Sequence, residues 1–143
     1  PSPYQAPTYP PPPNYPPPAS PYAVAAAPLS PEQERTWGTL AHAIPAACMV
    51  LSAGTLGFVG SLVVYLLYKD RGQFVRAHAA NSLNVQIMTA IILVVSVPLM
   101  LILVGFLTYG LALLVALIIH IVGATRANRG EWFSPPLTPA FVK

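Results

Sequence analysis

Two long apolar runs dominate the pattern of hydrophobic and polar positions, and a short charged stretch separates them. The first run extends from Leu40 to Tyr68 and the second from Val85 to Thr125. As single helices they would measure roughly 43 Å and roughly 60 Å, whereas a hydrocarbon core is about 30 Å thick. Each run must therefore bend, tilt or fold back. The pattern predicts an all-α membrane protein with a small bundle of three to four hydrophobic helices.

A helix start signal precedes the first run. Ser30 can cap a helix, Pro31 suits the first helical position, and Gln33 can reach back to complete a capping box. We therefore expect the first helix to begin at Pro31.

The first run also contains a break signal, Ser52-Ala53-Gly54-Thr55. It predicts one helix from Pro31 to about Ser52 and a second from about Leu56 to Lys69. The alternative is a single tilted span, in which three small residues form a face for close helix packing. These residues are Ala53, Gly57 and Ser61.

The second run is about twice as long as a membrane is thick, so it should form a hairpin. The segment from Gly105 to Gly110 is the predicted turn, between spans near Leu83–Val104 and Phe106–Arg126. Pro98 should kink the first of these spans, because proline lacks an amide donor.

The composition supports a membrane location, with 55% hydrophobic and 8% charged residues. The formal net charge of +3 comes from basic residues beside the apolar runs, which orient membrane proteins and do not form a nucleic-acid patch. Lys69, Arg71 and Arg76 lie between the runs, and Arg126 and Arg129 follow the second. We expect both groups, and the C-terminus, on the cytoplasmic side of a bacterial membrane. The side of the N-terminus depends on whether the first run crosses once or folds back.

Three regions follow from these patterns: a tail over residues 1–30, a helical membrane domain over 31–130, and a short C-terminal tail over 131–143. The N-terminal tail is rich in proline and tyrosine, includes Pro12-Pro13-Asn14-Tyr15, and should be extended polyproline II. We predict that it binds a partner protein, although such a composition also suits a solvated spacer. The predicted contact residues are Tyr4, Tyr9, Pro12, Pro13, Tyr15 and Tyr22.

No catalytic, cofactor or metal site is predicted. Cys48 is the only cysteine, and His42, His78 and His120 are separated by long intervals without ligand-type spacing. Haem ligation by two intramembrane histidines is a minor alternative. No acidic residue occurs between Asp70 and Glu131, which argues against a coupled ion transporter.

One polar stripe recurs every fourth residue, at His78, Ser82 and Gln86. It has two interpretations. It could contact a substrate or quinone headgroup, or it could supply hydrogen bonds inside the bundle.

Several segments carry a resemblance to known families. They are Arg35–His42, Tyr65–Asp70, Phe74–Ala79, Ser82–Gln86 and Ala124–Glu131. In these the chain resembles a bacterial family of short membrane proteins that is distantly similar to the small subunit of the chloroplast inner-envelope translocon, although Trp132-Phe133-Ser134-Pro135 departs from the family pattern. The resemblance implies four hydrophobic helices with both ends cytoplasmic. The architecture also resembles proline-rich factors of actinobacterial respiratory supercomplexes.

These observations lead to a functional hypothesis. We expect a non-enzymatic accessory or assembly subunit that contacts lipids and other integral membrane proteins, with cytochrome bc and aa3 subunits as the partners that the second resemblance implies. The alternative is a component of a protein-translocation or channel-like complex.

Overall fold

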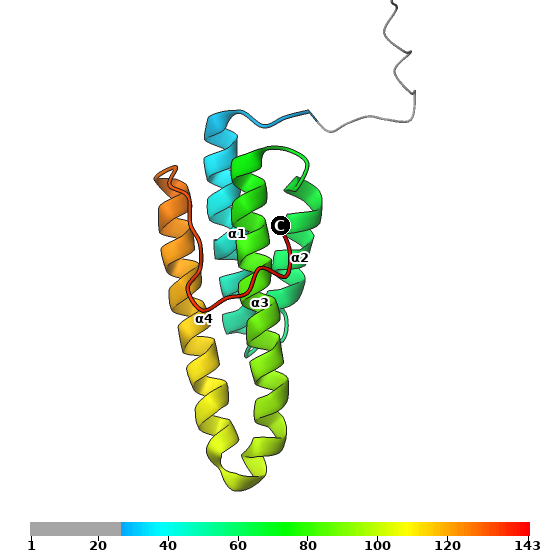
Figure 1. The fold of residues 1–143 in the computed structure, drawn as a ribbon, viewed down its shortest axis with the longest axis vertical. Coiled ribbons are helices and arrows are strands. Elements are labelled where there is room, and N and C mark those ends of the chain that lie inside the picture. Colours follow the sequence, from blue (N-terminus) through cyan, green and yellow to red (C-terminus); the bar gives the residue numbers. More distant parts are fainter. Residues whose placement is uncertain (1–26) are drawn as a thin grey trace, which may run out of the picture.

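Four α-helices make up most of the part of the chain that the computed structural model describes, residues 27–143 (Figure 1). They are α1 (Pro31–Leu51), α2 (Gly57–Tyr68), α3 (Gln73–Leu99) and α4 (Val104–Asn128), and a 3₁₀ turn, η1 (Met100–Ile102), joins α3 to α4. The predicted all-α membrane bundle is confirmed. The predicted contact residues of the tail lie outside the described residues, and partner binding there stays a prediction.

The start of α1 follows the predicted capping box. The amide of Gln33 donates to Ser30 Oγ over 3.3 Å, and the amide of Ser30 donates to Gln33 Oε1 over 3.0 Å. Two amides that have no partner within the helix are satisfied in this way. Helix α1 begins at Pro31 as expected.

The break in the first apolar run is also present. Helix α1 ends at Leu51, and Ala53 and Gly54 have positive φ angles of 51° and 102°, which interrupt the helix before α2 begins at Gly57. A single tilted span is thereby excluded. Ala53 lies in the turn and not on a helical face, whereas Gly57 and Ser61 lie in α2.

The second apolar run forms the predicted hairpin, but the prediction of its turn at Gly105–Gly110 was wrong, and the first helix of the hairpin extends well beyond the predicted span. Helix α3 begins at Gln73, ten residues before Leu83, and the turn is η1 with Leu103 at φ 67°, before Gly105. Gly105 lies within α4, where a Cβ atom would collide with the backbone of Ser96 and Met100. This glycine thus permits close approach of α3 and α4 and does not form the turn.

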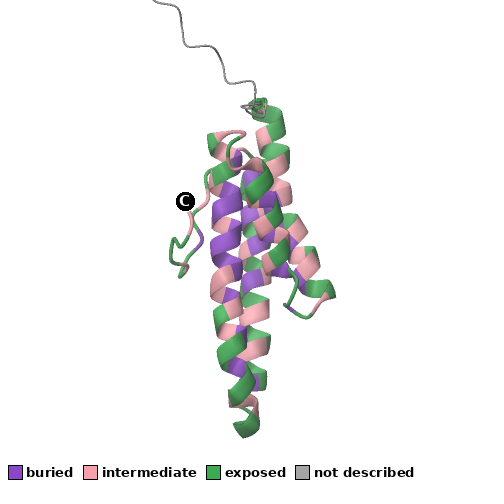
Figure 2. Ribbon diagram, turned by 90° about the vertical axis from the view of Figure 1, so that its right-hand side faces the viewer, coloured by how far each residue is buried: buried purple, intermediate pink, exposed green. Residues whose placement is uncertain are grey.

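The two helical hairpins differ in length (Figure 1). Helices α3 and α4 are long and apolar enough to cross a membrane, whereas α2 has 12 residues, roughly 18 Å. Exposed residues predominate where α3 and α4 extend beyond the first hairpin (Figure 2). We call the end of the bundle that holds residues 69–72, between α2 and α3, the connector end.

Residues 129–143 turn back from α4 and lie along the bundle (Figure 1). The side-chain amide of Asn84 holds them with two hydrogen bonds, donating to the carbonyl of Val142 over 2.9 Å and accepting from its amide over 2.7 Å. Asn81 donates to the carbonyl of Phe133. Tyr65 and Arg76 donate to the carbonyl of Lys143. This C-terminal segment is therefore part of the packed structure.

Glu34 on α1 caps the start of α3. Its Oε2 accepts the amides of Phe74 over 2.8 Å and Val75 over 3.1 Å, while the N-cap residue Gly72 has no side chain to do so. One carboxylate thus joins the first helix to the third.

We expect Glu34→Ala to lower the free energy of unfolding by about 1–2 kcal/mol, because two amides lose a charged acceptor. Glu34→Gln should lose less, since its amide oxygen can still accept. Thermal unfolding in detergent measures this, with the exposed Glu32→Ala as control. Equal stability of all variants would show that water replaces the cap.

Candidate functional site: a buried histidine chain

Three helices bring the three histidines of the chain together at the centre of the bundle. His42 comes from α1, His78 from α3 and His120 from α4, and all three are at most 1% exposed. His42 Nε2 lies 3.3 Å from His78 Nδ1, and His42 Nδ1 lies 3.4 Å from His120 Nδ1. The rings form a continuous chain with His42 in the middle.

A glycine makes this arrangement possible. A Cβ atom on Gly123 of α4 would lie 2.5 Å from His42 Cε1, closer than atoms can pack. Only glycine lets α4 approach the His42 ring here. The rings of Phe74 and Phe133 pack against His78 and His42 from the connector end. Aromatic rings therefore cover the histidine chain on the side of the connector end.

Each end of the histidine chain has a partner that fixes which ring nitrogens donate and which accept. His78 Nε2 lies 3.1 Å from the carbonyl oxygen of Glu131, which can only accept. His120 Nε2 lies 2.8 Å from Gln86 Nε2, which can only donate and also points to Met49 Sδ. If all three rings are neutral, only one combination of tautomers gives every contact one donor and one acceptor. His78 and His42 carry their protons on Nε2, and His120 carries its proton on Nδ1.

A second polar contact lies beside the chain. Ser61 of α2 and Ser82 of α3 are buried and lie 2.9 Å apart through their hydroxyl oxygens. The predicted stripe of His78, Ser82 and Gln86 therefore faces the bundle interior, with each residue bonded to a different helix. This geometry favours the interpretation that the stripe supplies internal hydrogen bonds.

Sequence spacing could not predict the histidine chain. His42, His78 and His120 lie on three helices, so their proximity depends on how those helices pack. The available signal was that His42 and His120 are each a lone polar residue in a largely apolar segment, and that His78 belongs to the polar stripe. A lone polar residue needs a partner in a membrane, and other buried histidines can be that partner.

The rings are arranged for hydrogen bonding and not for shared metal coordination. His42 contacts its neighbours through opposite nitrogens, so the three histidines do not converge on one point. Within residues 27–143, no group of three or more His, Cys, Asp or Glu side chains could hold a metal ion.

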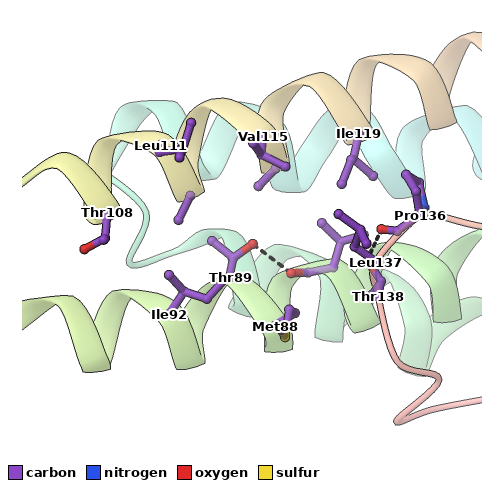
Figure 3. A pocket seen from close by; sticks show the side chains of 13 residues that line it. Met88, Thr89, Ile92, Thr108, Leu111, Val115, Ile119, Pro136, Leu137 and Thr138 are labelled. Carbon is purple, nitrogen blue, oxygen red and sulfur yellow. Dashed lines mark hydrogen bonds between the residues drawn. The ribbon is translucent and has the colours of Figure 1, made fainter. Parts of the chain in front are cut away.

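A separate cavity of about 340 Å³ lies between α3, α4 and the C-terminal segment (Figure 3). Its walls are largely apolar and include Met88, Ile92, Leu111, Val115 and Leu137. The hydroxyl of Thr89 donates to the carbonyl of Val85 in its own helix. The cavity has the chemistry of a hydrocarbon site and does not overlap the histidine chain.

The fold and the buried polar core define a small helical membrane protein. A family model described as the magnetosome magnetite crystal formation protein family, MamF/MmsF, matches residues 33–142. The chain belongs to this family. Comparisons with curated proteins and with solved structures find no match.

The family assignment corrects both sequence resemblances. The chain is not a member of the translocon-like family, and it is not a respiratory supercomplex factor. The resemblance to the first group rested on short separate segments, whereas the family model matches residues 33–142 as one stretch. The second rested on a proline-rich tail, a feature of composition alone. The predicted cytochrome bc and aa3 partners lose their basis.

Gly57 offers a test of how tightly the core is packed. A Cβ atom there would lie 2.6 Å from Gln86 Oε1, so Gly57→Ile should push Gln86 away from His120. We expect a loss of about 1–3 kcal/mol. The partly buried Leu62→Ile should cost less. Chemical denaturation in detergent compares the two, and equal midpoints would mean that Gln86 moves aside freely.

Proposed function

We propose that this protein is a non-catalytic accessory protein that acts by binding other integral membrane proteins in a system that forms magnetite crystals. The observation that carries the proposal is the family match over nearly the whole helical domain, residues 33–142. The family description supplies the link to magnetite.

The core geometry supports a non-catalytic role. The side chains of the histidine chain and of the Ser61–Ser82 pair are bonded to one another, and none of them lines the cavity between α3 and α4. A channel would need polar groups that face a water-filled path. This arrangement therefore also argues against the translocation or channel alternative.

The surface supports association within the membrane. Large apolar side chains are exposed on α2, α3 and α4, among them Leu66, Val94 and Leu107. Lipid or the helices of partner proteins can cover such a surface.

Two measurements test the proposal. A tag at the N-terminus is preferable, because the carbonyl of Lys143 is bonded to Tyr65 and Arg76. Purification in mild detergent followed by mass spectrometry should recover integral membrane proteins of the host. Expression in a magnetite-forming bacterium that lacks its own family member should change crystal size by electron microscopy, relative to the empty vector. Recovery of the chain alone together with unchanged crystals would contradict the proposal.

The orientation in the membrane is a further prediction. The basic residues at the connector end predict that this end, and with it the C-terminus, lies on the cytoplasmic side. In a Cys48→Ser background, Gln73→Cys and Ser134→Cys should resist an impermeant thiol reagent in intact cells and react after lysis. Labelling of both positions in intact cells would reverse the orientation.

A further inference from the structure

The turn between α1 and α2 is level with the middle of the second hairpin and not with its tip. The hydroxyl of Tyr109 donates to the carbonyl of Ala53 over 2.6 Å. A Cβ atom on Gly54 would lie 2.7 Å from Leu93 Cδ1. Beyond Leu93, α3 and η1 continue to Ile102, roughly 13 Å farther.

The exposed apolar surface sets the scale of the membrane. On α4, exposed apolar residues extend from Val104 to Val122, roughly 27 Å, which is close to the thickness of a hydrocarbon core. The α1–α2 turn therefore lies near the middle of this band. The exposed apolar side chains of α2, from Val59 to Leu67, cover the half nearer the connector end.

The polar groups of the α1–α2 turn have hydrogen-bond partners within the protein. Backbone groups that leave a helix at membrane depth need partners within the protein. Ser52 Oγ donates to the carbonyl of Cys48 and accepts the amide of Leu56 over 2.8 Å. The hydroxyl of Tyr109 supplies a further donor, and Gly54 is buried. These contacts are what a turn inside the hydrocarbon requires.

We propose that α1 and α2 form a re-entrant hairpin that occupies only the leaflet at the connector end, while α3 and α4 extend through both. The protein then fills the area of four helices in one leaflet and of two in the other. Such a wedge fits best where the bilayer bends with the connector-side leaflet on the convex face. The partner is thus a strongly curved phospholipid bilayer. This inference is independent of any role in magnetite formation.

The depth of the turn can be measured directly. In a Cys48→Ser background, a spin label at Thr55→Cys should report the middle of the bilayer, with high exposure to oxygen and low exposure to a water-soluble nickel reagent. A label at Gln73→Cys should report the connector-side surface. Exposure of the Thr55→Cys label to the water-soluble reagent on the side opposite Gln73 would show that α1 and α2 cross the membrane and would overturn the proposal.

Preference for curvature is measured with full-length protein in phospholipid vesicles of two sizes. Protein oriented with its connector end outward, selected by labelling at Gln73→Cys, should reach about twofold higher density per area on the smaller vesicles. A variant with about nine apolar residues added to each helix at the turn, roughly 13 Å, should lose this preference. Equal density of the unmodified protein on both sizes would overturn the curvature preference, whether or not the longer variant folds.

Discussion

Replacing His42 by leucine should lower the stability of the bundle by about 2–4 kcal/mol, because one substitution leaves two buried groups without partners. His120 loses the acceptor for its Nδ1 proton, and His78 loses the donor to its Nδ1. Both rings are almost completely buried, so water cannot replace the lost bonds. Hydrogen bonds between membrane helices average only about 0.6 kcal/mol, which makes a larger loss informative.

Denaturation in detergent measures the effect of His42→Leu, with Leu51→Ala as the control on α1, where Leu51 is 88% exposed. A double-mutant cycle with His120→Leu separates the shared contact from general loss of packing. We expect the double variant to lose less than the sum of the two single losses. Additive losses, or a loss below about 1 kcal/mol for His42→Leu, would show that the rings do not act as one chain.

Asn84→Leu should release the C-terminal segment from the bundle. Asn84 is 2% exposed and is bonded to both backbone polar groups of Val142, so leucine removes two hydrogen bonds at once. We expect a local loss of about 2–3 kcal/mol, with faster amide exchange and proteolysis over residues 131–143.

Hydrogen exchange followed by mass spectrometry resolves this local effect from global unfolding. The exposed Ser134→Ala serves as the control within the same segment. Exchange over α3 and α4 should remain unchanged in both variants. If the segment stays protected in Asn84→Leu, then Tyr65 and Arg76 suffice to hold it.

Local signals in the sequence predicted the features that depend on a few neighbouring residues. The capping box at Ser30 and the break at Ser52–Thr55 need only the chain near them, and both are present. The helix count follows from this break and from the length of the second run. The role of Gly105 could not be predicted, because the sequence does not distinguish a glycine that allows close helix approach from one that forms a turn.

Features that depend on packing were beyond sequence reasoning. The bonded pairs of the histidine chain are 36 and 78 positions apart in the sequence, and the chain requires Gly123 to let α4 approach His42. Glu34 capping α3 is a similar case, since its partners lie 40 and 41 residues away. The sequence shows the polar stripe, but it does not show which helices supply the hydrogen-bond partners of the stripe residues.

The direction of the histidine chain sets its capacity for protons. Three neutral rings hold three N–H groups, and one additional proton fits if Gln86 rotates its amide to present oxygen to His120 Nε2. A second additional proton would place two N–H groups head to head between neighbouring rings. The hydrogen-bond pattern therefore has room for at most one additional proton, and only after a rotation of Gln86, whose amide packs against Gly57 at the first residue of α2.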